Sequence, residues 1–427
     1  MLTLLGFATI AVFLVAVLSG RVSALVALVL IPLIFGLFTG AGTALGPMML
    51  GGLIKVAPVA IMVSFAILYF GLMIDRGLFD PMIGGILRLT KGDPMRVGAA
   101  SVVLTTVVSL DGDGSTTFLI TIAALRPIYD RLGMSRLVMA TCIGLSAGVM
   151  NMLPWGGPTA RAMAMLGAES SQIFNPLIVP MIAGLVWAVV AGAILGHREG
   201  KRLNLGAGSD ALVADFMPQK NNGSRALFWF NAALTAALLT ALVLEVLPLS
   251  ALFIIAFALA LVVNCPRWED QQKQLASHAS SVVLVSGMMF AAGIFTGILT
   301  GTKMLDAITA ATVSIVPENA GAFLPVIVAI TSMPLSLALT PDAYYFGVLP
   351  VLTETAKSLG LDPLQIGRAA LLGHTTTGFP LSPLVGAAFV LVGRAGVPFG
   401  ALQRAMFPWA FATTVVMTIV AYLIGVI

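Results

Sequence analysis

Charged side chains are scarce in this sequence: Asp, Glu, Lys and Arg together make up 9% of its 427 residues. Soluble globular domains carry about 25% charged residues. Hydrophobic residues account for 59% of the chain and the mean hydropathy is +1.04. Many apolar runs approach the roughly 20 residues that a membrane-spanning helix needs. A chain this poor in charge cannot cover a water-facing surface, so a soluble domain is excluded and an all-α polytopic membrane protein is predicted.

Cysteine is also scarce, and the only two, Cys142 and Cys265, lie far apart in the chain. This excludes a disulfide framework and a cysteine-based metal site. The net charge of +4 is too small for a nucleic-acid footprint. The first apolar run, Met1 to Leu18, lacks the basic start and the cleavage site of a signal peptide, so we expect a retained span. The 44 Gly and 23 Pro lie inside apolar runs, where they indicate broken or closely packed membrane helices.

The two halves of the chain resemble each other at an offset of about 226 residues. Gly71-Leu72-Met73 matches Gly297-Ile298-Leu299, and Asn151-Met152-Leu153-Pro154 matches Thr377-Gly378-Phe379-Pro380. Glycines and prolines matched at one nearly constant offset favour an internal repeat over chance similarity between apolar segments. The polar stretch between the halves predicts an N-terminal repeat at 1–196, a cytoplasmic linker at 197–225 and a C-terminal repeat at 226–427.

Lysine and arginine set the orientation, because cytoplasmic loops carry an excess of both. Two basic loops, Arg88 to Arg96 and Arg126 to Arg136, enclose a segment at about 97–125. If both loops are cytoplasmic, that segment must enter the membrane and return on the same side, as a re-entrant hairpin. In the equivalent loops of the second half, 316–321 and 353–363, the only basic residue is Lys357. A second hairpin at about 322–352 therefore enters from the opposite side.

Each half has about five spans, one of them broken, which makes the repeats inverted and places both termini outside. We expect spans at about 2–18, 22–38, 53–73, 137–166 (broken), 176–196, 226–243, 250–264, 279–300, 365–395 (broken) and 405–425. Inverted repeats with interrupted helices are typical of secondary transporters, whose site lies near the midplane where the repeats meet. We expect a multi-pass protein of the cell (cytoplasmic or inner) membrane.

Three aspartates occupy the predicted hairpin tips: Asp111 and Asp113 in the first and Asp342 in the second. Intramembrane carboxylates are costly and usually mark ion or substrate pathways. With Ser115 and Thr116, they supply hard oxygen ligands that suit a divalent cation, Na⁺ or a proton. The alternative is a tip at the water boundary, where Asp and Gly simply form a turn.

The first broken helix contains two prolines around a glycine pair, which cannot remain helical. A helix that restarts near Thr159 aims free N–H groups and a positive dipole end into the cavity, where they suit an anion. Arg161 adds a bidentate clamp for a carboxylate, unless it is an ordinary arginine near the outer surface. The candidate substrate-binding residues of this segment are Asn151, Gly156, Gly157, Thr159 and Arg161.

The second broken helix carries a cluster of hydroxyl groups that suits a carboxylate or an ion. Its candidate residues are Thr375, Thr376, Thr377 and Ser382. His374 is the histidine that falls inside a predicted span, and it is a candidate proton relay. The alternative for His374 is a packing residue.

The segments Leu110-Asp111-Gly112-Asp113-Gly114-Ser115-Thr116-Thr117 and Met152-Leu153-Pro154-Trp155-Gly156-Gly157-Pro158-Thr159 resemble the citrate–metal–proton symporter family (CitMHS). The resemblance covers essentially the full length. It implies uptake of citrate with a divalent cation, Mg²⁺ or Ca²⁺, as co-substrate, together with protons and without a permanently bound cofactor. It also implies a homodimer in the membrane lipid, with a scaffold and a moving, elevator-type transport part. Sodium-coupled relatives carry Ser-Asn-Thr at the hairpin tips, whereas this chain has Asp113-Gly114-Ser115-Thr116 and Thr340-Pro341-Asp342. This difference favours a metal or a proton over Na⁺ as the coupling ion.

The implied cargo agrees with the charge balance, since citrate carries about three negative charges at neutral pH and is costly to desolvate without a cation. The nearest alternative is a proton- or sodium-coupled carrier of another di- or tricarboxylate or organic acid. An enzyme is not expected. An aspartyl intramembrane protease needs Gly-x-Gly-Asp, but Leu110 precedes Asp111 here, and His374 has no Gly-x-Ser-Gly partner. A channel fits inverted hairpins less well than alternating access does.

Overall fold

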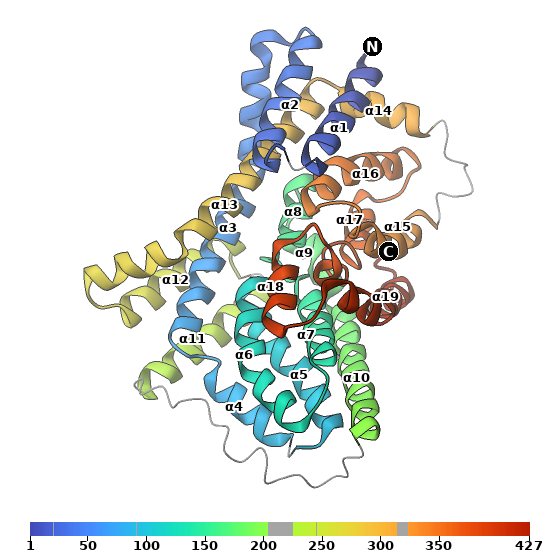
Figure 1. The fold of residues 1–427 in the computed structure, drawn as a ribbon. Helices are drawn as coiled ribbons and strands as arrows, with labels where there is room; N and C mark the ends of the chain where they lie inside the picture. Colours follow the sequence, from blue (N-terminus) through green and yellow to red (C-terminus); the bar gives the residue numbers. More distant parts are fainter. Residues whose placement is uncertain (20, 91, 204–224, 245, 314–322) are drawn as a thin grey trace.

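The computed structural model describes the chain except for residues 20, 91, 204–224, 245 and 314–322, and the described part is helical without a β-strand (Figure 1). The helices of the first half are α1 (Leu2–Leu18), α2 (Ala24–Phe38), η1 (Gly42–Ala44), α3 (Leu45–Asp75), α4 (Asp80–Leu89), α5 (Pro94–Val108), η2 (Ser109–Asp111), α6 (Gly114–Leu132), α7 (Arg136–Met150), α8 (Gly157–Leu166), α9 (Ser170–Ile173), η3 (Asn175–Leu177) and α10 (Ile178–Leu203).

The second half repeats this order with helices of similar length. They are α11 (Arg225–Val243), α12 (Leu249–Asn264), α13 (Trp268–Gly301), α14 (Met304–Val313), α15 (Leu324–Leu335), η6 (Ala343–Val348), α16 (Leu349–Ser358), α17 (Pro363–Leu371), η7 (Phe379–Leu381), α18 (Gly386–Ala395) and α19 (Phe399–Leu423). The predicted all-α fold of two repeats, each with a hairpin and a broken helix, is confirmed. The predicted boundaries of the repeats as domains stay a prediction.

Within the described residues, five helical segments are long and apolar enough to cross a membrane: Gly42–Asp75, Ser170–Leu203, Arg225–Leu242, Trp268–Gly301 and Phe399–Leu423. Shorter apolar helices, α1, α2 and α12 among them, accompany these five segments. The chain is thus a multi-pass membrane protein.

The helices α3 and α13 are longer than the spans predicted from the sequence. They have 31 and 34 residues, whereas the predicted spans covered 53–73 and 279–300. Hydropathy marks only the most apolar part of each helix, and the helical backbone continues into the polar residues after Trp268. A helix of 31 residues is about 46 Å long, so α3 reaches from the group of α1 and α2 to α4 at the other end of the molecule (Figure 1).

Glycine permits α3 and α13 to pack backbone to backbone. A Cβ atom on Gly52 would lie 1.9 Å from the carbonyl oxygen of Gly293, which no side chain tolerates. The same contact recurs between α5 and α10, where a Cβ atom on Gly98 would lie 2.1 Å from the carbonyl oxygen of Gly192. Small residues let membrane helices approach closely. The second crossing therefore holds α5, which is one arm of the first hairpin, against α10.

Both predicted hairpins are present as helix–turn–helix units. The first consists of α5 and α6, which the turn at residues 109–113 connects. Gly112 adopts the left-handed conformation (φ 73°) that this turn requires, a conformation in which glycine costs little. In the second hairpin, α15 is followed by the turn before Asp342 and then by the π-helical η6. The two tips therefore differ in backbone geometry, although their places in the two halves correspond.

Two predicted loops are different in the structure. The basic segment around Arg88 was expected to be a loop but contains the ten-residue helix α4. The predicted linker begins inside α10, which continues to Leu203, and its residues 204–224 lie outside the described part of the chain. The whole of the predicted outward loop at 316–321 also lies outside the described part.

Candidate functional site

Arg161 and Asp342, predicted from different halves, form an ion pair. The Nε atom of Arg161 donates a hydrogen bond to Oδ1 of Asp342 at 2.8 Å. The Nη1 atom of Arg161 also donates to the carbonyl oxygen of Gly157 at 3.0 Å, which fixes the side chain against its own helix, α8. The two side chains are only 18% and 15% exposed, so solvent screens this pair far less than it screens a surface ion pair. The pair joins α8 to the tip of the second hairpin.

The first tip uses its aspartates to build its own turn. Asp113 is the N-cap of α6: its carboxylate accepts hydrogen bonds from the backbone N–H groups of Ser115 and Thr116, both at 3.1 Å, and from the Thr116 hydroxyl. Asp111 is buried, and its Oδ1 accepts from the backbone N–H of Asp113 at 3.1 Å and from the Thr117 hydroxyl at 3.2 Å. The turn role, which the sequence left open as an alternative, is therefore present; a metal or proton role for these aspartates stays a prediction.

The two helix breaks contact each other directly. The Nδ2 atom of Asn151 donates a hydrogen bond to the carbonyl oxygen of Thr375 at 2.6 Å. Thr375 has a φ of 55°, which is strained for a β-branched residue, and its N–H donates to the Ser336 hydroxyl at 3.1 Å. These bonds hold the second break in a conformation that it would not adopt by itself. The matched repeat segments thus face each other in the fold.

The first break is shaped by its own polar groups. The Thr159 hydroxyl is buried and donates a hydrogen bond to the carbonyl oxygen of Met152 at 2.7 Å. This bond gives a partner both to a carbonyl group of the helix break and to the hydroxyl itself. Gly156 precedes α8, and a Cβ atom there would lie 2.3 Å from the carbonyl oxygen of Asn151. Glycine is therefore required at position 156 for the tight return of the chain. Gly157 begins α8 and provides the carbonyl that Arg161 contacts.

His374 packs against two tyrosine rings. Its ring stacks on Tyr344 with centroids 3.8 Å apart and meets Tyr345 edge-on at 5.6 Å. Its Nδ1 is 2.8 Å from the Thr375 hydroxyl, and the Tyr345 hydroxyl donates to the His374 carbonyl at 2.9 Å. The Nε2 atom is buried and has no hydrogen-bond partner among the described residues. The ring packs against these tyrosines, as the alternative expected, and the role of His374 as a proton relay stays a prediction.

The remaining hydroxyl groups of the second break are all buried, but they serve different roles. Thr377 exchanges a hydrogen bond with Thr414 of α19, and the Ser382 hydroxyl accepts from the N–H of Leu384 at 3.3 Å. The Thr376 hydroxyl has no hydrogen-bond partner in the described part of the chain. Among the described residues, Thr376 is thus the one of the three predicted threonines whose hydroxyl is unpartnered, and its role in substrate binding stays a prediction.

The first tip contacts both breaks. The indole N–H of Trp155 donates to the carbonyl oxygen of Leu110 at 2.9 Å, and Phe379 stacks on Phe118 with centroids 5.8 Å apart. A cleft of about 10 Å³ lies between the first tip and the two breaks, and it has room for about one water molecule. Its lining includes Ser109, Gly112, Asp113, Thr117, Asn151 and Phe379. The tips and the breaks therefore form one junction, closed down to a narrow cleft in this conformation.

Asp111 and Asp113 are joined by a hydrogen bond within the first tip, whereas Asp342 pairs with Arg161. In the described part of the chain, no group of three or more His, Cys, Asp or Glu side chains is placed to hold a metal ion.

Sequence reasoning missed Tyr344, Tyr345 and Ser336, which hold His374 and Thr375 in place. A usable signal was present, because two of only five tyrosines follow Asp342 almost directly at the second tip. A tyrosine suits a hairpin tip inside the membrane, because its ring packs against apolar neighbours while its hydroxyl forms a hydrogen bond.

Comparison with known proteins gives consistent matches. Residues 5–373 match the family model CitMHS, described as citrate transporter. A citrate transporter of Bacillus subtilis (strain 168) is 51% identical over 428 residues and covers 100% of both chains. A Mg(2+)/citrate complex secondary transporter of the same organism is 43% identical over 100% of this chain and 99% of its own.

Among solved structures, the YdaH transporter of Alcanivorax borkumensis, described as having an unusual topology, matches with a TM-score of 0.58 over 88% of this chain and 87% of its own. Its sequence is 15% identical, so this likeness shows the fold alone. The relatives of high identity are transporters and not enzymes, as predicted. Since the family model and two full-length relatives agree with the resemblance seen in the hairpin and break motifs, the chain belongs to the citrate transporter family.

Proposed function

We propose that this protein imports citrate as a complex with a divalent cation, Mg²⁺ or Ca²⁺, together with protons. The observation that carries the proposal is the mostly buried pair of Arg161 and Asp342 at the meeting point of α8 and the second tip. A metal–citrate complex presents both a cation and carboxylates. Each member of the pair has one matching partner in it: the carboxylate of Asp342 for the metal and the guanidinium of Arg161 for a citrate carboxylate.

Charge balance supports a proton in the same step. Citrate carries about three negative charges at neutral pH, and a divalent cation leaves about one, which is costly to bury alone. Arg161 and Asp342 cancel each other, so this pair leaves the remaining negative charge of the cargo uncompensated. A proton taken up with the complex removes that charge. His374, with its buried and unpartnered Nε2, is the proposed carrier of this proton.

The remaining predicted residues have proposed supporting roles. Ser115, Thr116 and Thr376 offer hydroxyl oxygens near the tips and breaks, and Asp111 and Asp113 offer further carboxylates.

We also propose that the two hairpins and broken helices move together against α3, α13 and their neighbours in an elevator-type cycle. In this proposal both termini lie on the outer side of the membrane, and two copies of the chain form a homodimer. The likeness in fold to the YdaH transporter and the matched order of helices support the repeated fold on which this proposal depends.

Thermal stabilisation of the purified protein tests the cargo. A ligand that binds the folded state raises the melting temperature as its concentration exceeds its dissociation constant. We expect citrate with Mg²⁺ or Ca²⁺ to stabilise the protein, and citrate with a chelator to have no effect. Equal stabilisation by metal-free citrate would refute the metal complex. Stabilisation by succinate, malate or gluconate instead of citrate would favour a carrier of another organic acid.

Uptake into proteoliposomes tests the residues and the proton. We expect Arg161→Lys to weaken the apparent affinity for metal–citrate, because an ammonium cannot form the planar fork of a guanidinium. His374→Phe keeps an aromatic ring against Tyr344 and Tyr345 but removes both nitrogens. We expect this variant to lose the stimulation of uptake by an inward proton gradient. Full stimulation in His374→Phe would exclude this histidine as the proton carrier.

A further inference from the structure

Trp155 lies where the first break, the first tip and the helices α3 and α12 meet. Its ring stacks on Phe70 of α3, with centroids 5.2 Å apart and an interplanar angle of 26°, and it meets Phe253 of α12 edge-on at 5.2 Å. The side chain is only 4% exposed. In the proposed cycle the break and the tip move, whereas α3 and the adjacent α12 do not. One buried ring therefore bridges two parts that move against each other.

The same indole holds the first tip. Its N–H donates a hydrogen bond to the carbonyl oxygen of Leu110 at 2.9 Å. A Cβ atom on Gly112 would lie 2.7 Å from Cδ1 of Trp155, so the ring lies directly against the backbone of the turn. Asp113, which caps α6, is the next residue. Loss of the indole N–H would leave a partly buried carbonyl without its donor and would loosen the turn.

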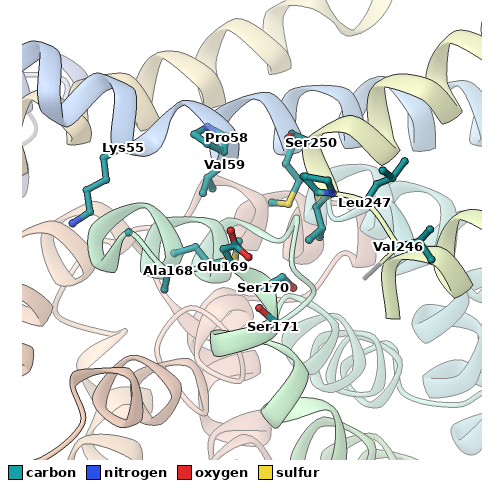
Figure 2. Close-up of a pocket in the computed structure, with 15 residues that line it drawn as sticks. Lys55, Pro58, Val59, Ala168, Glu169, Ser170, Ser171, Val246, Leu247 and Ser250 are labelled. Carbon is teal, nitrogen blue, oxygen red and sulfur yellow. The ribbon is translucent and has the colours of Figure 1, made fainter. Parts of the chain in front are cut away.

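Nearer the start of α3, its packing against the segment that follows the first break is incomplete. A cavity of about 420 Å³ lies between α3, the segment from α8 to α9 and the connection between α11 and α12 (Figure 2). Its apolar lining includes Pro58, Val59 and Met62 of α3 and Met163 and Ala168 of the α8–α9 segment. Atoms that face a cavity lose the contacts that packed neighbours provide. The aromatic contact of Trp155 is therefore a larger share of what holds the two parts together.

We propose that Trp155 is a positioning residue with two separable contacts. Its N–H fixes the first tip for cargo binding, and its ring face holds the transport part, the hairpins and broken helices, against α3 in this conformation. The inference rests on the proposed elevator-type cycle, because a break that moves past α3 has to leave the stack on Phe70. The first contact affects the affinity for the cargo, and the second affects the balance between conformations.

Uptake into proteoliposomes measures the first contact. Trp155→Phe keeps a ring on Phe70 but removes the N–H that the Leu110 carbonyl accepts. We expect its KM for citrate with Mg²⁺ to rise about fivefold, with a maximal rate within about twofold of that of the unchanged protein. Phe70→Leu leaves the N–H in place and should keep the KM. An unchanged KM in Trp155→Phe would overturn the role of the N–H.

Distances between two spin labels measure the second contact. One label replaces Ile54, an exposed residue of α3, and the other replaces Phe389, an exposed residue of α18. The native Cys142 and Cys265 are buried, so they stay in place. We expect the unchanged protein to show one main distance. Phe70→Leu loses the stack and should change the ratio of two distance populations about fivefold.

Phe65→Leu is the matched control. It also removes a phenylalanine of α3 and a ring contact with α12, that of Phe65 with Phe257 at 6.0 Å. This control and Trp155→Phe, which keeps a ring on Phe70, should both show the distances of the unchanged protein. Equal ratios in Phe70→Leu and the control would overturn the role of the stack. If Phe70→Leu does not fold, Phe253→Leu replaces it, because it removes the edge-on contact of the same indole.

The outcomes separate this inference from the proposed function. If citrate with Mg²⁺ produces a second distance in the unchanged protein but all variants respond alike, the cycle stands and the role of Trp155 fails. If no second distance appears under any condition while uptake continues, the elevator-type cycle fails together with this role. The cargo is tested by melting of the unchanged protein, which does not depend on either result.

Discussion

The guanidinium of Arg161 and the carboxylate of Asp342 lie 2.8 Å apart although 181 positions separate them in the chain. Each was expected to bind a ligand by itself: Arg161 a carboxylate and Asp342 a metal or a proton. In the structure each is the partner of the other, so a cargo that uses both must replace a mostly buried ion pair. Opposite charges in the cargo make this exchange possible, which is why we propose a metal–carboxylate complex rather than a free carboxylate as the cargo.

Removing one member of this pair should destabilise the protein and end transport. We expect Arg161→Met to lower the free energy of unfolding by about 3 kcal/mol, because it leaves a mostly buried carboxylate unpaired. The exchanged double variant Arg161→Asp with Asp342→Arg should recover much of that stability but no citrate uptake. Recovery of uptake in the exchanged variant would show that the pair is structural and does not bind the cargo.

Asp113 allows the cap and the charge to be tested separately. Asparagine caps a helix about as well as aspartate, whereas alanine costs about 1 kcal/mol. We therefore expect Asp113→Asn to melt like the unchanged protein and Asp113→Ala to melt earlier. If the carboxylate contacts the metal, Asp113→Asn also loses uptake of metal–citrate. Normal uptake by Asp113→Asn would leave Asp113 with the capping role alone.

Thr375 should reverse the usual order of glycine and alanine. In a helix, glycine is less stable than alanine by about 0.5–1 kcal/mol. At a φ of 55°, however, a side chain costs about 1–2 kcal/mol that glycine avoids. Both replacements lose the hydroxyl that contacts His374, so their difference measures backbone strain. We expect Thr375→Gly to be more stable than Thr375→Ala by about 1 kcal/mol; equal melting temperatures would show that the position is not strained.

Two adjacent glycines of α3 offer a matched pair for the packing of α3 on α13. A Cβ atom on Gly52 collides with the backbone of Gly293, whereas a Cβ atom on Gly51 meets nothing within 4 Å. We expect Gly52→Ala to lower the melting temperature and to reduce the yield of folded protein. Gly51→Ala should melt at the same temperature or slightly higher, because alanine favours the helix. Similar behaviour of the two variants would contradict the close crossing.

Much of this protein was determined by local sequence alone. Scarce charge and long apolar runs indicate a polytopic membrane protein, and Asp-Gly tips and Pro-Gly pairs mark the hairpins and breaks, because turn chemistry acts over a few residues. The repeat at an offset of about 226 residues predicted that the second half copies the order of the first. Helix ends were predicted less well, since α3 and α13 extend beyond their apolar centres.

Only the tertiary structure decided which of these groups become partners. Arg161 pairs with Asp342, Asn151 holds the strained Thr375 across 224 positions, and Trp155 stacks on Phe70. None of these relationships has a local signal, because each depends on how the helices of the two halves cross. Glycine crossings such as that of Gly52 with Gly293 set this packing, and a glycine in the sequence does not reveal which backbone it will meet.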